Sequence, residues 1–310
     1  INFRMIVNKK SDLSTINKSI FEMLYNIADE ENKDVFLESY LYETMKNKNK
    51  DVVEFILQNN VPYDNLLFEA VKLNDIEMVE LVLTHDESPY FINKMSSKGT
   101  ALYMAVKNKN IDIVKRLLSI SGINPSLRAN DETPLIAAFS LFNMEMINLF
   151  YDFYAENIQS QLWQFNGALK LVLELLSRNF SDYKSSAPDV IQKLYNIENI
   201  DYNCSGNNYT LLTYACEAGQ KELAEKLLKC ENVSGNTPLM VSIEKGNLEI
   251  TKLLIQSSKV EINARNYLNQ TALTIASEKN FTDIVELIVN NKSFDPKESN
   301  LDYAFYLSGK

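Results

Sequence analysis

Residues 133–138 read Thr-Pro-Leu-Ile-Ala-Ala, and this stretch decides the fold because its pattern recurs along the chain. Each copy has a Thr two positions before a Leu and a small residue three positions after that Leu. The copies span Thr100–Ala105, Thr133–Ala138, Thr210–Ala215, Thr237–Ser242 and Thr271–Ala276. Recurrence of one pattern at a near-constant period indicates a repeat protein.

Each unit of the repeat predicts a pair of helices. The Thr is typical of a helix N-cap, and the Pro or Ala after it suits the first helical turn. The Leu and the small residue share one helix face, and the small side chain lets the second helix approach closely. The second helix follows a polar corner and carries an aliphatic pair that returns one turn later, as in Ile113-Val114 and Leu117-Leu118. A single pair cannot bury both of its faces, so neighbouring pairs are expected to stack into a solenoid.

The same spacing extends beyond the five clear copies to weaker ones. The anchor leucines of all copies are Leu41, Leu67, Leu102, Leu135, Leu212, Leu239, Leu273 and Leu301. The interval between Leu135 and Leu212 is the longest and has room for two units, so a degenerate repeat is expected there. The copy at Leu301 is truncated by the end of the sequence.

The spacing divides the chain into four segments. Residues 1–38 are expected to hold an N-terminal helical cap or the remnant of upstream repeats. Repeats follow over residues 39–151, and residues 152–205 hold the degenerate repeat, in which Val172 and Val190 lie much further apart than the corresponding Ala105 and Ile113. The extra residues, around 178–189, predict a lengthened loop between the two helices. Further repeats span residues 206–310, the last of them truncated.

The repeated residues resemble the ankyrin repeat family, whose signature Thr-Pro-Leu-His-x-Ala and period of about 33 residues match the copies above. The resemblance covers roughly residues 39–310 and implies an all-α ankyrin-type solenoid of stacked helix pairs. Two departures are evident. The intervals that begin at Leu41, Leu212 and Leu273 are too short for full hairpins, so the fingers are expected to be short or absent. The histidine of the signature is missing from every copy, so its hydrogen bond must be made otherwise or lost.

Composition argues against several classes of function. The only histidine is His85, which follows a predicted second helix where a cation favours the helix dipole, so a structural role is expected. Cys204, Cys216 and Cys230 have no zinc-binding spacing, and we expect no enzymatic activity, no metal and no cofactor. The net charge of −10 disfavours nucleic acid, and no apolar run is long enough for membrane insertion. Three cysteines in 310 residues predict an intracellular, cytoplasmic protein.

A partner-binding surface follows from the family resemblance. Ankyrin-type arrays bind on a concave face that is formed by the connection tips and the exposed side of the first helices. At the tips this pattern nominates Asn130, Glu132, Asn207, Tyr209, Tyr267 and Gln270. On the first helices it nominates Glu217, Glu244, Lys245 and Glu278. The tyrosines would serve as apolar anchors, and the carboxylates favour a basic or mixed protein partner.

The sequence therefore predicts a non-enzymatic protein–protein interaction scaffold. The alternative is a tethering or regulatory module of a larger protein whose catalytic domain lies outside this chain. Residue 1 is Ile, which favours a piece excised from a longer protein. The identity of the partner does not follow from the repeats, because tip residues vary with the target while the scaffold does not.

Overall fold

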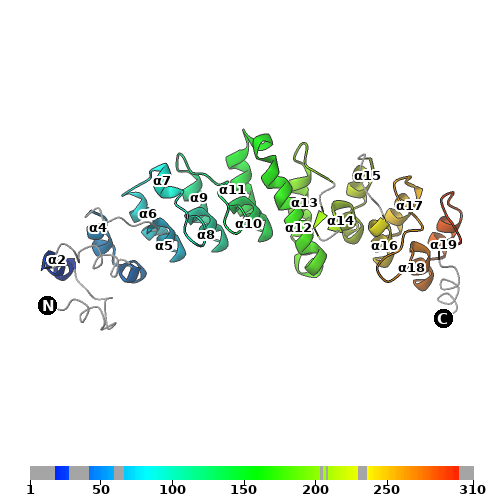
Figure 1. Cartoon of the computed structure of the whole chain (residues 1–310), viewed down its shortest axis with the longest axis horizontal. Helices are drawn as coiled ribbons and strands as arrows, with labels where there is room; N and C mark the ends of the chain where they lie inside the picture. The colour runs from blue at the N-terminus through cyan, green and yellow to red at the C-terminus, as the bar shows by residue number, and fades with distance from the viewer. Residues whose placement is uncertain are drawn as a thin grey trace. The chain divides into compact units, whose positions relative to one another are not determined.

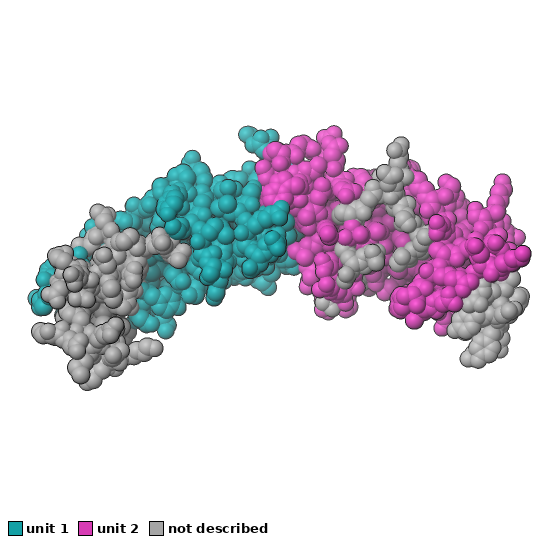
Figure 2. Space-filling model, viewed as in Figure 1, with its two compact units in different colours: residues 1–158 teal, residues 159–310 magenta. Residues whose placement is uncertain are grey.

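The computed structural model describes residues 18–27, 42–58, 66–202, 205–206, 209–229 and 236–299, which are mostly helical (Figure 1). It divides into two compact units, residues 1–158 and residues 159–310 (Figure 2). Each unit is a stack of helix pairs, and each is described by itself. Leu41 and Leu301 lie outside the described residues, as do Cys204, Cys230 and most of residues 1–38.

Unit 1 contains successive helix pairs. Its elements are a helical stretch at 42–46, α2 (Lys18–Ile27), α4 (Lys50–Gln58), α5 (Leu66–Lys72), α6 (Ile76–Leu83), α7 (Pro89–Ile92), α8 (Ala101–Lys107), α9 (Ile111–Leu118), α10 (Pro134–Ser140) and α11 (Met144–Tyr154). The first helices α5, α8 and α10 pack in succession, and the second helices α4, α6, α9 and α11 form a second row. Helix α2 packs on α4, where the ring of Phe55 meets Phe21 and Tyr25 edge-on.

Unit 2 repeats this arrangement. Its elements are α12 (Leu162–Tyr183), α13 (Ala187–Tyr195), β1 (Ser205–Gly206), β2 (Tyr209–Thr210), α14 (Leu211–Ala218), α15 (Lys221–Lys229), α16 (Asn236–Glu244), α17 (Leu248–Gln256), α18 (Ala272–Glu278) and α19 (Thr282–Val289), with a 3-10 turn η2 (Ile158–Gln161) before α12. The first helices pack in the order α12, α14, α16, α18. Strands β1 and β2 pair antiparallel, with Ser205 opposite Thr210, and form a short hairpin against α12.

The threonines cap the first helices, as the sequence predicts. Thr100, Thr133, Thr210 and Thr271 each accept a hydrogen bond from the backbone N–H three residues later. Thr237 differs, because α16 already begins at Asn236. The described anchor leucines, from Leu67 to Leu273, are buried, and so are the small residues three positions after them. The core positions are therefore confirmed, and the N-cap role is confirmed for four of the five threonines.

The missing signature histidine is replaced in different ways. Thr213 and Thr274 complete capping boxes with Thr210 and Thr271, so two of the replacements make a local hydrogen bond. Tyr103 instead donates its hydroxyl to Glu132 in the next connection, at 2.8 Å. Ile136 and Met240 are buried apolar side chains, so in those two repeats the hydrogen bond is lost.

A left-handed residue turns the chain between the two helices of most pairs. The residues at these corners are Lys48, Asn74, Lys109, Phe142, Gly219, Gly246 and Asn280, whose φ angles lie between 51° and 72°. In four pairs the side chain of the next residue accepts a hydrogen bond from a backbone N–H in the first turn of the second helix: Asn49, Asp75, Asn110 and Asn143. The polar corners seen in the sequence thus reverse the chain and begin the second helix.

Asparagine side chains join neighbouring repeats. The Nδ2 groups of Asn108, Asn247 and Asn291 donate to the backbone oxygens of Val71, Cys216 and Ile255 in the preceding repeats. These oxygens lie near helix C-termini, where carbonyl groups have no partner within the helix. These three asparagines therefore serve the contacts between repeats.

The lengthened loop expected around residues 178–189 is not formed. Helix α12 continues to Tyr183, and only residues 184–186 separate it from α13. The extra residues contain no helix breaker before Pro188, and Glu174 pairs with Arg178 one turn along the helix at 2.6 Å. Pro188 lies in the first turn of α13, where its missing N–H costs nothing. The insertion therefore lengthens the first helix and leaves the loop short.

The cap at Asp75 offers a test of the corner. Asp75 accepts hydrogen bonds from the backbone N–H groups of Glu77 and Met78 and pairs with Lys48 at 2.8 Å. We expect Asp75→Ala to lower the free energy of unfolding by about 0.5–2 kcal/mol, the usual cost of losing an N-cap. The measurement is urea denaturation followed by circular dichroism, and an unchanged midpoint would contradict the assignment.

The same cap predicts a pH dependence. The Lys48 ammonium, and then the backbone donors, hold the pKa of Asp75 below its usual value. The resulting stabilisation is therefore complete above the unfolded pKa of about 4 and disappears as pH falls through the lower folded value. Asp75→Asn keeps an oxygen acceptor but has no charge, so we expect this variant to lose less stability than wild type over that acid range.

Candidate partner-binding surface

Four of the nominated residues lie at the C-terminal ends of first helices in unit 2. Glu217 is near the end of α14, Glu244 is the last residue of α16, Lys245 follows it, and Glu278 ends α18. Because α14 packs on α16 and α16 packs on α18, these helix ends follow one another along the unit. The regular offset from the anchor leucines is what puts them in register.

Glu217 is largely neutralised within the protein. Its carboxylate lies 2.6 Å from the ammonium of Lys245 and accepts a hydrogen bond from the Tyr209 hydroxyl at 2.8 Å. The side chain of Glu217 is only 13% exposed. The structure therefore brings three nominated residues together, but in a cluster that links two repeats.

Tyr209 does not have the exposed position expected of an anchor. It is 8% exposed, because the β1–β2 hairpin packs against α12. Burial, followed by the neighbouring Glu217 carboxylate, raises the pKa of the Tyr209 hydroxyl. Its ring therefore contributes to the contact between repeats, and the anchor prediction is wrong for this residue.

Glu244 and Glu278 retain exposed charge. Both side chains are exposed, and within the described part of unit 2 neither takes part in an ion pair. Lys279 next to Glu278 is also exposed. The C-terminal ends of the first helices thus present the carboxylates of Glu244 and Glu278 and the ammonium of Lys279. The ammonium of Lys245 instead pairs with Glu217.

Tyr267 and Gln270 belong to the connection that leads into α18. The Asn266 side chain accepts hydrogen bonds from the backbone N–H groups of Leu268 and Gln270, and the Asn266 N–H donates to the Gln270 carbonyl. This tight turn leaves Tyr267 93% exposed and Leu268 61% exposed. Leu268 was not nominated from the sequence, although an adjacent Tyr and Leu in a polar connection is a signal that could have identified it.

In unit 1, Asn130 and Glu132 form the corresponding tip. Ala129 and Glu132 pair in an antiparallel bridge around Asn130 and Asp131, whose φ angles of 52° and 65° are those of a tight hairpin turn. Asn130 is exposed. Glu132 accepts from Tyr103 and lies 2.7 Å from the ammonium of Lys107, so it repeats the Tyr–Glu–Lys arrangement of unit 2. Asn207 lies outside the described residues.

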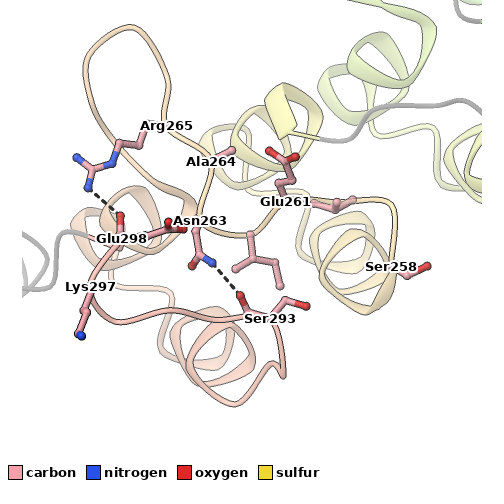
Figure 3. Close-up of a pocket in the computed structure, with 10 residues that line it drawn as sticks. Ser258, Glu261, Asn263, Ala264, Arg265, Ser293, Lys297 and Glu298 are labelled. Atoms are coloured by element: carbon pink, nitrogen blue, oxygen red, sulfur yellow. Dashed lines mark hydrogen bonds between the residues drawn. The ribbon is translucent and has the colours of Figure 1, made fainter.

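A pocket of about 700 Å³ lies between two successive connections of unit 2 (Figure 3). At its edge Asn263 Nδ2 donates to the Ser293 carbonyl and Arg265 donates to the Glu298 carbonyl, each at 2.8 Å. Glu261 and Lys297 also line it. These hydrogen bonds join one connection to the next, so Asn263 and Arg265 serve the contact between repeats.

The described residues also bear on the predictions about metal binding, His85 and the cysteines. No group of three or more His, Cys, Asp or Glu side chains among them could hold a metal ion. His85 is exposed just past α6, and Cys216 is buried, which raises the pKa of its thiol. Over the same residues, no helix is both long and apolar enough to cross a membrane.

Comparison with known proteins identifies the family of the repeats. A family model described as ankyrin repeats, in three copies, matches residues 67–161 and 181–266. The chain is 32% identical over 98 residues to alpha-latroinsectotoxin-Lt1a of Latrodectus tredecimguttatus, and this match covers 30% of the chain. It is 25% identical over 276 residues, or 78% of the chain, to the NAD-dependent deacetylase sir2B of Dictyostelium discoideum. It is 26% identical over 139 residues, or 40% of the chain, to the human transient receptor potential cation channel subfamily A member 1.

The matched segments are small parts of these relatives. They amount to 7% of the toxin, 33% of the deacetylase and 12% of the channel. The family match, in contrast, covers more than half of this chain and coincides with the stacked helix pairs of both units. The chain belongs to the ankyrin repeat family, whose repeats are protein–protein interaction modules and generally have no catalytic role.

Proposed function

We propose that this chain is a non-enzymatic scaffold that binds a partner protein on the face formed by its first helices and connection tips. In ankyrin-type arrays this is the concave face. The observation that carries the proposal is the combination of two exposed carboxylates, Glu244 and Glu278, with the exposed apolar tip of Tyr267 and Leu268. Neither feature is used in contacts between repeats, unlike Glu217 and Tyr209.

The partner segment that fits this face combines an apolar side chain with Lys or Arg. The apolar side chain would cover the Tyr267–Leu268 tip, because an aromatic ring offers a large contact area at low entropic cost. The basic groups would meet Glu244 and Glu278. The net charge of −10 supports such a partner and opposes nucleic acid. An intracellular location stays a prediction from the cysteine content.

The test uses a peptide display library and the whole chain as bait. We expect enrichment of peptides that carry Lys or Arg next to an aliphatic or aromatic residue. For an enriched peptide, Tyr267→Ala should weaken binding by about 1–2 kcal/mol, the range of an interface anchor. Glu244→Lys/Glu278→Lys should mainly slow association and reduce its salt dependence, as expected of exposed charges.

A matched variant separates this face from general charge effects. Glu222→Lys/Glu286→Lys makes the same change in net charge on exposed positions of the second helices α15 and α19. We expect this control to bind like wild type at high salt. At low salt we expect it to weaken binding less than Glu244→Lys/Glu278→Lys does. Equal losses from both double variants, with Tyr267→Ala unchanged, would contradict the proposed face.

The second candidate is a tethering or regulatory module within a larger protein. It is supported by the small share of each relative that the matches cover, including 33% of a protein described as an NAD-dependent deacetylase. The test is the full-length reading frame together with an NAD-dependent deacetylase assay of its product. A catalytic domain beside the repeats would favour tethering. Deacetylase activity in the 310-residue chain itself would refute its non-enzymatic role.

A further inference from the structure

The connection between α6 and the next repeat carries an additional helical turn, α7. Residues 84–91 separate the end of α6 from Ile92, whereas the shorter stretch 257–261 separates the end of α17 from Ile262. Ile92 and Ile262 hold equivalent positions in their connections, because the asparagine that follows each of them donates a hydrogen bond to the next connection. Asn93 donates to the Gly122 carbonyl and Asn263 to the Ser293 carbonyl, each at 2.8 Å. Residues 84–91 therefore hold an insertion, and insertions in repeats are places where functional sites occur.

This insertion exposes a hydroxyl group directly before a proline. Ser88 is exposed together with Glu87, Pro89 and Tyr90. The φ and ψ angles of Ser88, −60° and 147°, are those of extended backbone. Ser88 holds α7 only by local contacts: its Oγ accepts from the Phe91 N–H at 3.4 Å, and its carbonyl accepts from the Ile92 N–H. An enzyme that binds extended substrate can reach this hydroxyl from solvent.

The other Ser/Thr-Pro dipeptides of the chain are Thr133-Pro134 and Thr237-Pro238. Thr133 is fully buried, and its hydroxyl caps α10 by accepting from the Ile136 N–H at 3.2 Å. Thr237 lies within helix α16 and has helical backbone. Of these three sites, only Ser88 combines exposure with extended backbone.

The charges around Ser88 indicate the class of enzyme. Residues 83–87, Leu-Thr-His-Asp-Glu, contain no Lys or Arg, so a kinase with an acidic subsite for basic residues before the serine is disfavoured. Residues 90–93, Tyr-Phe-Ile-Asn, contain no carboxylate, so a kinase that requires acidic residues after the serine is disfavoured as well. Pro89 remains as the recognition element.

We propose that Ser88 is a phosphorylation site for a proline-directed Ser/Thr protein kinase and that the added phosphate opens helix α7. The kinase transfers the γ-phosphoryl group of ATP to Ser88 Oγ. The bond between the γ-phosphorus and the β–γ bridging oxygen breaks, an Oγ–P bond forms, ADP leaves, and the hydroxyl proton passes to the catalytic base of the kinase. This proposal does not depend on the partner-binding face of unit 2.

Electrostatics explain the opening. A phosphoserine carries close to two negative charges at neutral pH. It would lie beside two carboxylates, because Asp86 accepts a hydrogen bond from the Ser88 N–H at 2.7 Å and Glu87 is the adjacent residue. Of the cations near this segment, Arg116 is already shared between Glu80 and Glu87, and Lys94 donates to the Tyr90 hydroxyl. A four-residue helix offers little dipole in compensation, so repulsion should dominate.

The experiment treats the whole chain with MgATP and a purified mitogen-activated protein kinase, followed by peptide mass spectrometry. We expect one phosphate, on Ser88, and none on Thr133 of the same molecule. Ser88→Ala should abolish this modification. Pro89→Ala keeps the hydroxyl and should lower the initial rate at least tenfold. Circular dichroism of each variant checks that the repeats remain folded.

Several results would contradict the proposal. A synthetic peptide of residues 83–93 that is phosphorylated while the folded chain is not would overturn accessibility of Ser88 in the folded state. Phosphate on other residues with none on Ser88, or an unchanged rate for Pro89→Ala, would overturn the site or its recognition. Hydrogen exchange then tests the opening: the Phe91 and Ile92 amides should exchange at least fivefold faster after phosphorylation, with α8 unchanged. Unchanged exchange at α7 would refute the electrostatic effect.

Discussion

Leu135→Ala is expected to lower the free energy of unfolding by about 2–5 kcal/mol, the usual cost of truncating a buried leucine. Leu135 is the anchor of the clearest repeat copy and is fully buried in α10. Residues 134–139 of α10 are all buried and already packed, so their side chains have little freedom to move into the cavity. The measurement is urea unfolding by circular dichroism.

Because a repeat contacts mainly its neighbours, the loss should be local. Hydrogen exchange should accelerate in α8, α9, α10 and α11 of unit 1, whereas α18 and α19 of unit 2 should keep their wild-type rates. Leu268→Ala is the control, since it truncates a leucine that is 61% exposed and should change stability by less than about 0.5 kcal/mol. Equal effects of the two substitutions would show that the anchor assignment is wrong.

Gly99→Ala is expected to cost about 2–5 kcal/mol for a different reason, because backbone strain and overpacking add together. Gly99 pairs with Ser96 in a tight turn and has φ of +106°, a conformation that side chains rarely adopt. A Cβ at this position would lie 2.6 Å from the Cβ of Ala129 in the next connection and 2.9 Å from the ring of Tyr103. Thermal unfolding followed by circular dichroism measures the loss.

Gly246→Ala separates these two causes. Gly246 also has positive φ, +72°, but the nearest atom to a new Cβ is Phe281 Cζ at 3.8 Å. This control should cost about 1–2 kcal/mol, the strain of a left-handed residue alone. If Gly99→Ala destabilises no more than Gly246→Ala in thermal unfolding, the close approach of successive connections is not what Gly99 provides.

Much of the fold follows from local sequence. Thr133 and Thr271 cap helices because each side-chain oxygen accepts a hydrogen bond from the backbone N–H three residues later. This contact lies within one helical turn and needs no other repeat. The same holds for the buried stripe of Ile113, Val114 and Leu117, which repeats with the period of a helix. The length of α12 was not predicted, because residues 178–183 are polar enough for a loop and form a helix by local pairing such as that of Glu174 with Arg178.

The candidate surface was less predictable than the fold. Glu244, Glu278 and Tyr267 are exposed at the positions that the repeat register gives them. Tyr209 and Glu217 occupy register positions of the same kind but are taken up by contacts with Lys245 and α12. Whether a residue at a tip faces solvent depends on the size and charge of its neighbour in the adjacent repeat, which lies far away along the chain.

The sequence by itself determined the repeat, the helix pairs, their caps and their buried faces, since each of these depends on residues within one helical turn or one helix pair. The tertiary structure alone decided which polar side chains remain available to a partner. Lys245 reaches back to Glu217, and Lys107 reaches forward to Glu132, so charges that look alike in the sequence are neutralised in one repeat and exposed in another. The physical reason is that ion pairs and burial between repeats depend on distances across the stack, which periodicity along the chain does not specify.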